Sequence, residues 1–167
     1  MYFLFNFTQY LLNKMYQLKH TQQLPISLND AWDFLSNPAN LRIITPDNMS
    51  FNVLSESRSM YAGQIIQYTV KPLLGIKTKW VTEITHVQPK HYFVDEQRLG
   101  PYKIWHHQHF LKEIEGGVLM EDIVHYKIPF GILGRLVHPI LVKPKLNTIF
   151  EYRRKKLIEI FGAYNIN

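Results

Sequence analysis

Hydrophobic positions recur along the chain with two periods, and the longest helical pattern lies near the C-terminus. From Lys143 to Gly162 the apolar residues fall within one arc of roughly 120°; they are Leu146, Ile149, Phe150, Leu157, Ile160 and Phe161. Pro144 suits a first helical turn, and Gly162 suits a left-handed stop. The pattern predicts one long amphipathic helix over 144–161, which needs a broad apolar partner.

A period of two residues supplies that partner. Polar and apolar residues alternate over 15–24, which predicts a strand. After Asp47 the chain reads as six further strands, near 49–56, 62–71, 76–87, 91–98, 102–114 and 118–128. Glycine, proline and short links separate them, which favours an antiparallel meander.

Two short helices interrupt this order after the first strand. Ser27 with Asp30 forms a start like a capping box for a helix over 28–35, and Asn37-Pro38 caps a second one that ends near Ile44. A further helical stretch leads from Gly131 to His138-Pro139, directly before the long helix. The predicted class is α+β, in the order strand, two helices, six strands and a long helix.

The length of 167 residues predicts one domain, over 15–162, with a short tail at 163–167. Residues 1–14 are either an extension upstream of the true start or a segment packed on the domain. They lack the basic region and cleavage site of a secretory signal, so we expect a cytoplasmic protein. The sequence contains no cysteine, which excludes disulfides and thiol chemistry.

Two motifs carry a resemblance to a known family. The first runs Phe93-x-Asp95-x-Gln97-x-x-Gly100-Pro101-Tyr102-x-x-Trp105-x-His107-x-His109, and the second runs Met120-x-Asp122-x-Val124-x-Tyr126-x-x-Pro129-Phe130-Gly131. They resemble bacterial members of the SRPBCC superfamily, which includes START lipid-transfer domains, the major birch-pollen allergen and polyketide cyclase/dehydratase-like proteins. The resemblance covers residues 15–161. It implies the helix-grip fold, in which a curved antiparallel sheet wraps around a C-terminal helix and encloses a cavity.

The aromatic content of 14% is high and suits the wall of such a cavity. Candidates for the wall are Trp80, Phe93, Trp105, Tyr126 and Phe150. We expect a volume on the order of 300 Å³ or more, enough for a ligand of drug size.

Polar residues fall on the same strand faces as these aromatic residues. They are Asp95 and Gln97 on one strand, His107 and His109 on the next, and Asp122 on the last. Buried polar groups need partners, and pairing of Asp with His would supply them. The group is either an orienting cluster for a ligand, an acid–base pair, or an internal network that only fixes strand register.

Arg153 lies near the middle of the apolar arc. A guanidinium stays charged, so a buried one must be paired. We predict that Arg153 points inward and pairs with Asp95 or Asp122, or binds an anionic ligand group. The alternative is an arginine that extends past the sheet edge to solvent.

A metal site needs more ligands than His107-x-His109 alone. The third and fourth ligands would have to come from Asp95, Asp122 or His125. Asp122 and His125 face opposite sides of one strand, so they cannot both join the two histidines at one metal ion. The neighbouring His106 is expected in solvent. No phosphate-binding loop or nucleophile motif is present. We therefore expect no metal and no cofactor.

The formal net charge is +6, and residues 135–156 contain seven Lys or Arg and one acidic residue. This basic stretch could attract a membrane surface or an acidic partner. No nucleic-acid-binding motif accompanies it, so nucleic acid is not an expected partner.

Three functions follow from these features. The first is binding or transport of a small hydrophobic molecule, such as a lipid, polyketide or other aromatic, without catalysis. The second is a cyclase or dehydratase that uses His107 or His109 as the base and Asp122 to orient it. The third is an interaction module that docks through its basic helix.

Overall fold

The computed structural model describes residues 14–55, 59–72 and 75–165. The predicted extension at 1–14 lies outside them except for Lys14, and the predicted tail lies partly outside. Seven antiparallel strands form one open sheet in the order β1-β7-β6-β5-β4-β3-β2. The strands are β1 (Tyr16–Leu24), β2 (Asn52–Val53), β3 (Gln64–Val70), β4 (Thr78–Gln88), β5 (Tyr92–Leu99), β6 (Ile104–Ile114) and β7 (Gly117–Lys127).

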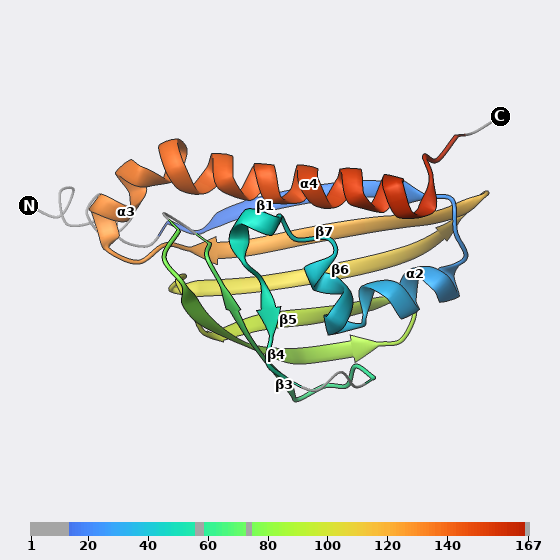
Figure 1. Cartoon of the computed structure of the whole chain (residues 1–167), viewed down its shortest axis with the longest axis horizontal. Coiled ribbons are helices and arrows are strands. Elements are labelled where there is room, and N and C mark those ends of the chain that lie inside the picture. The colour runs from blue at the N-terminus through green and yellow to red at the C-terminus, as the bar shows by residue number, and fades with distance from the viewer. Residues whose placement is uncertain (1–13, 56–58, 73–74, 166–167) are drawn as a thin grey trace, which may run out of the picture.

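Helices follow β1 and β7. The α-helices are α2 (Leu28–Leu35), α3 (Gly131–Val137) and α4 (Lys143–Phe161); the 3-10 helices are η1 (Pro38–Arg42) and η2 (Asp47–Met49); and η3 (His138–Val142) is π-helical. Helix α4 runs along the sheet beside β1 and β7 (Figure 1). The predicted α+β helix-grip fold is confirmed. No helix among the described residues is long and apolar enough to cross a membrane.

The middle of the predicted apolar arc on α4 is its buried face. Leu146, Phe150, Arg153 and Leu157 are all buried, at helical spacing. Leu146 and Phe150 pack into an aromatic cluster with Trp80 and Tyr126, while Leu157 packs with residues of α2 and β7. Ile149 and Phe161, at the two edges of the arc, are half-buried. Ile160 lies within the arc but in the last turn of the helix, and it is 41% exposed.

The C-terminal helix begins earlier than predicted. Residues 131–161 form a continuous run of 31 helical residues, made of α3, η3 and α4. Pro139 and Pro144 both lie within this run, each at the start of its own segment. Proline lacks the N–H that a helix interior uses, and a π-helical turn is one way to accommodate the missing bond.

Two other elements differ from their predictions. Of the strand expected at 49–56, the structure assigns Asn52–Val53 as β2, which pairs with Thr69 and Tyr68 of β3. Residues before it form η2, and Ser50 adopts a left-handed conformation with φ 47°, which interrupts an extended chain. The helix expected over 38–44 is the 3-10 helix η1. Its predicted cap is present, because Asn37 Oδ1 accepts a hydrogen bond from the Ala39 amide.

Candidate functional site

Strand register brings four polar residues together on the concave face. Antiparallel pairing sets Asp95 of β5 opposite His107 of β6, and it sets His109 of β6 opposite Asp122 of β7. Residues two apart on a strand share a face, so both histidines project to the same side. The two histidines therefore lie between the carboxylates of Asp95 and Asp122. We call Asp95, His107, His109, Asp122 and Arg153 the polar cluster.

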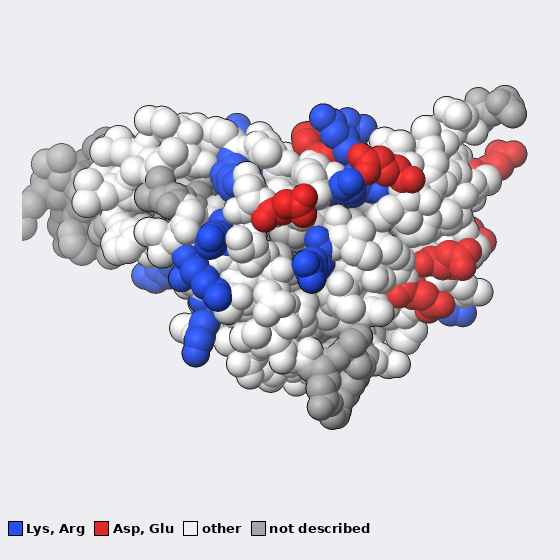
Figure 2. All heavy atoms as spheres, in the orientation of Figure 1, with Lys and Arg blue, Asp and Glu red and all other residues white. Residues whose placement is uncertain are grey.

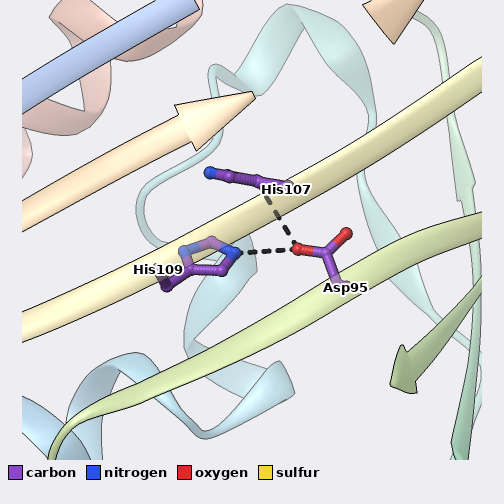
Figure 3. Close-up of side chains that lie close together, drawn as sticks. All are labelled: Asp95, His107 and His109. Carbon is purple, nitrogen blue, oxygen red and sulfur yellow. Dashed lines mark hydrogen bonds and ion pairs between the residues drawn. The ribbon is translucent and has the colours of Figure 1, made fainter. Parts of the chain in front are cut away.

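Each histidine in the cluster contacts both carboxylates. Asp95 Oδ2 lies 2.8 Å from His109 Nε2 and 3.5 Å from His107 Nδ1 (Figure 3). On the other side, Asp122 Oδ1 lies 3.1 Å from His107 Nε2 and 2.8 Å from His109 Nδ1. The two imidazole rings are in contact, tilted by 37° with centroids 3.7 Å apart. All four side chains thus form one closed network.

Arg153 joins this network from α4. Its Nη1 lies 3.3 Å from Asp122 Oδ2 and 3.4 Å from Asp122 Oδ1. Arg153 is only 9% exposed, and Asp122 only 1%. The predicted inward ion pair of Arg153 is confirmed, with Asp122 as the acid, and the alternative of an arginine extending to solvent is wrong.

Both carboxylates of the cluster are held in the charged form. Burial alone would raise the pKa of Asp122, but the Arg153 guanidinium and the hydrogen bond from His107 outweigh burial and hold this pKa well below its ordinary value. Burial likewise opposes ionisation of Asp95, yet the hydrogen bond from His109 lowers its pKa. The cluster therefore contains two negative charges and one permanent positive charge.

The two histidines differ in the direction of their pKa shifts. Burial and the neighbouring His109 lower the pKa of His107, against its contact with Asp122. Burial would also lower the pKa of His109, but its contacts with Asp122 and Asp95 outweigh burial and raise it. A proton on His109 brings the cluster to neutrality, because two carboxylates then face one guanidinium and one imidazolium. His107 is then the neutral partner.

The cluster forms one part of the wall of a cavity of about 190 Å³ between the sheet and α4. Asp95, His107, His109 and Arg153 line it, and so do the predicted wall residues Trp80, Phe93, Trp105 and Phe150. The volume is smaller than predicted. Trp80, Tyr102 and Trp105 pack against one another inside, with ring centroids 4.8 to 5.7 Å apart, and occupy part of the space.

Three residues predicted in the wall lie elsewhere. Asp122 is buried behind the two histidines and does not reach the cavity. Gln97 turns to the next loop, where its Nε2 donates to Tyr102 O at 2.6 Å and its Oε1 accepts from Tyr102 N at 3.1 Å. Tyr126 packs in the core with its hydroxyl 2.8 Å from His138 Nε2. Gln97 and Tyr126 therefore shape the fold around the cavity.

Sequence reasoning missed wall residues outside the central strands. They include Pro38, Leu41, Ile44, Met49, Phe51, Tyr68, Thr82, Tyr102 and Ile149. Several come from η1, η2 and the adjoining loops, where no periodic pattern marks a face. Tyr102 was present in the first family motif, and that was the available signal. The missed residues show that the segment after α2 closes one side of the cavity.

The arrangement of the cluster also bears on metal binding. Ligand atoms of Asp95, His107 and His109 all lie within 4.8 Å of one another, which is compatible with a divalent ion. His125 lies on the opposite face and contacts Gln17, as its position on the strand predicted. His106 also faces outward, but it is half-buried beside Glu96 rather than fully exposed.

Solved structures provide the comparison with known proteins. No protein-family profile and no curated protein sequence matches the chain. Protein CV1439 from Chromobacterium violaceum is similar with a TM-score of 0.67 and 10% identity, over 89% of this chain and 99% of that one. Protein TTHA0849 from Thermus thermophilus is similar with a TM-score of 0.65 and 13% identity, over 86% and 95%. Ara h 8.0201 is similar with a TM-score of 0.55 and 11% identity, over 87% and 99%.

The chain shares their helix-grip fold. This is the fold that the sequence motifs led us to expect. Identities of 10 to 13% establish the fold alone. Activity has to be argued from the cavity and the polar cluster.

Proposed function

We propose that the protein binds a compact hydrophobic molecule in the cavity between the sheet and α4. The observation that carries this proposal is a wall made mostly of apolar and aromatic side chains, with the polar cluster on one side. Ligand sites commonly combine a largely apolar wall with a few convergent polar groups that fix orientation. The apolar wall would bury the body of the ligand, and the cluster would bind its polar end.

The cluster and the volume narrow the class of ligand. Asp95 keeps 15% of its side chain exposed and accepts hydrogen bonds, so it suits a ligand hydroxyl. Both ring nitrogens of His109 already face carboxylate oxygens at 2.8 Å, so Asp95 is the group that the cluster offers to the ligand. About 190 Å³ favours a molecule of one or two rings, since an apolar cavity of roughly 150 Å³ holds benzene. A polyketide-like or other aromatic molecule therefore fits better than a long-chain lipid.

The three tryptophans provide the experiment. Trp80 and Trp105 line the cavity, whereas Trp32 packs edge-on against Phe93 and is not in the wall. An environment-sensitive dye should bind in the cavity, and aromatic compounds of one or two rings should displace it. Changing both Trp80 and Trp105 to Phe alters the cavity wall and should change the affinity for the dye, while Trp32→Phe, outside the wall, should leave the affinity unchanged. No dye binding at high micromolar concentration, across a varied panel of competitors, would refute the proposal.

A second candidate is acid–base catalysis in the same cavity. The observation that favours it is that His107 and His109 line the cavity while each contacts two carboxylates, which is how a base and its orienting group are arranged. His107 would act as the neutral base, with Asp122 as a positioning residue. A poly-β-ketone substrate should then be turned over by wild type and not by His107→Gln, while both still bind the dye. Dye binding by wild type without turnover of the substrate would contradict the catalytic function and support ligand binding alone.

A further inference from the structure

The helical segment before α4 presents its apolar side to the outside. Seven large apolar side chains between residues 130 and 141 are exposed: Phe130 81%, Ile132 50%, Leu133 70%, Leu136 64%, Val137 42%, Ile140 74% and Leu141 41%. We call them the α3 patch. On a helix the residues 132, 136 and 140 form one row and 133, 137 and 141 the adjacent row, so six of the seven cover one continuous face.

The inward side of the same segment is fixed by small or hydrogen-bonded residues. Gly134, His138 and Val142 are buried at four-residue spacing. A Cβ at Gly134 would lie 2.1 Å from Pro129 O, so only glycine allows this close approach. His138 bonds the Tyr126 hydroxyl and stacks on Tyr16 with centroids 3.6 Å apart. The segment is thus anchored with its apolar face outward.

Among the described residues, the charged side chains of the segments that end near α3 are all positive. The strands pair so that the start of β1, the end of β3, the starts of β4 and β6 and the end of β7 meet at the same edge of the sheet as α3. The described residues of these segments and of 127–145 contain no Asp or Glu. Their cations are Lys14, Lys71, Lys77, Lys79, Lys103, Lys127, Arg135, Lys143 and Lys145. On the face in Figure 2 the charged spheres at the α3 end are blue, while red ones lie at the middle and the far end.

We propose that the α3 patch and its basic surround form a docking surface for acidic phospholipid membranes. An exposed apolar helix face bordered by lysines is the arrangement that lies in the membrane interface, with apolar side chains among the acyl chains and cations at the headgroups. A contiguous apolar surface of this kind is uncommon on a monomer and marks an interaction site. The inference stands on the outer surface and does not depend on the proposed ligand.

The charge around the α3 patch favours an acidic membrane over a second copy of the chain as the binding partner. A symmetric dimer through the α3 patch would bring two basic edges together, since the same surface meets itself in a two-fold contact. Like charges would then oppose association, whereas anionic headgroups complement them. The sequence alone pointed to the basic face of α4 for membrane contact. The structure instead combines apolar surface with basic charge at α3.

The test uses the full chain and sedimentation with vesicles of phosphatidylcholine, with or without phosphatidylserine. Wild type should bind the acidic vesicles and lose binding as salt rises. The double variant Leu133→Ser with Ile140→Ser should lower the partition coefficient about tenfold or more, because two exposed apolar side chains no longer enter the bilayer. The matched control, Leu54→Ser with Ile160→Ser, alters residues that are also exposed, at 54% and 41%, but lie outside the α3 patch.

Charge variants complete the test. Changing Lys14, Lys103 and Lys143 to Gln should weaken binding to acidic vesicles, while changing Lys112 and Lys155 to Gln should not. Equal binding by wild type and the Leu133/Ile140 variant, at unchanged circular dichroism, would overturn the proposal. So would dimerisation of wild type that the same variant abolishes. Dye binding in the cavity, measured without vesicles, should persist in the Leu133/Ile140 variant, so failure of the two proposals can be told apart.

Discussion

At the scale of single residues, the polar cluster depends on which groups carry charge. Arg153 neutralises Asp122 from the helix, and His109 bridges Asp122 to Asp95 from the sheet. Both contacts are buried, so removing one partner leaves an uncompensated charge in an apolar setting. These residues therefore affect stability as well as any bound ligand.

Arg153→Met should destabilise the protein by about 3 kcal/mol or more, because Asp122 loses the guanidinium that compensates its buried charge. The neighbouring variant Arg154→Met is the control. Arg154 pairs with Glu151 on the exposed side of α4, and its loss should change the free energy of unfolding by less than about 1 kcal/mol. Urea unfolding of both variants measures the difference. Equal stability of the two would show that the buried pair contributes nothing.

His109→Gln should change the dependence of stability on pH. The pKa of His109 is raised in the folded state through its contacts with Asp122 and Asp95 despite burial. Its contribution is thus complete below the unfolded value of about 6.5 and is lost as pH rises through the folded pKa. Wild type should lose stability above that pH, and His109→Gln should lose less. The exposed variant His91→Gln should follow wild type; an unchanged slope in His109→Gln would contradict the assignment of the proton.

At the scale of elements, one part of the C-terminal helical run packs on the sheet and the other part exposes apolar residues. Its second part, α4, covers the sheet through the buried row Leu146, Phe150, Arg153 and Leu157. Its first part, α3 and η3, turns toward the end of β7 (Figure 1), and the apolar residues of the α3 patch lie on its outer side. Close approach at Gly134 fixes that orientation.

Gly134→Ala should displace α3 from Pro129, since the added Cβ meets backbone that cannot move as a flexible side chain would. A cost of about 1 to 3 kcal/mol is typical of overpacking. Hydrogen exchange should become faster over residues 131–142 while β6 and β7 stay protected. Leu133→Ala, on the exposed face, serves as the control. An unchanged exchange rate in Gly134→Ala would show that the backbone at Pro129 can move to accommodate the added Cβ.

At the scale of the whole molecule, stability should be uneven across the sheet. β6 and β7 are interior strands of 11 residues each, paired on both sides, whereas β2 is an edge strand of two residues. Opening of an element costs less where few paired and buried groups hold it. The cavity lies toward the β3 side, between η1, η2 and α4. The weaker edge is thus beside the cavity.

Native-state hydrogen exchange should therefore be slowest in β6 and β7 and fastest at β2. A cavity ligand should slow exchange near Met49 and Phe51, which line the cavity, and leave β1 unchanged. The measurement compares the protein with and without the displacing aromatic compound. Uniform slowing over the whole sheet would instead indicate only global stabilisation by the ligand.

The sequence by itself determined the order of elements, the sheet, the buried face of α4 and the inward position of Arg153. Periods of two and of 3.6 residues specify which side of each element is apolar, and that follows from local geometry. The same alternation placed Asp95, His107 and His109 on inward faces. Local pattern was sufficient wherever one element needed only one apolar face.

Only the tertiary structure decided the contacts between elements. Strand register set Asp95 opposite His107 and His109 opposite Asp122, and a shift of one residue would have reversed these faces. Packing of α4 on the sheet places Arg153 against Asp122 and not Asp95. Gln97 hydrogen-bonds the Tyr102 backbone and so points away from the cavity. The outward α3 patch and the small cavity volume arise from packing of residues distant in sequence, and no single-strand or single-helix periodicity encodes them.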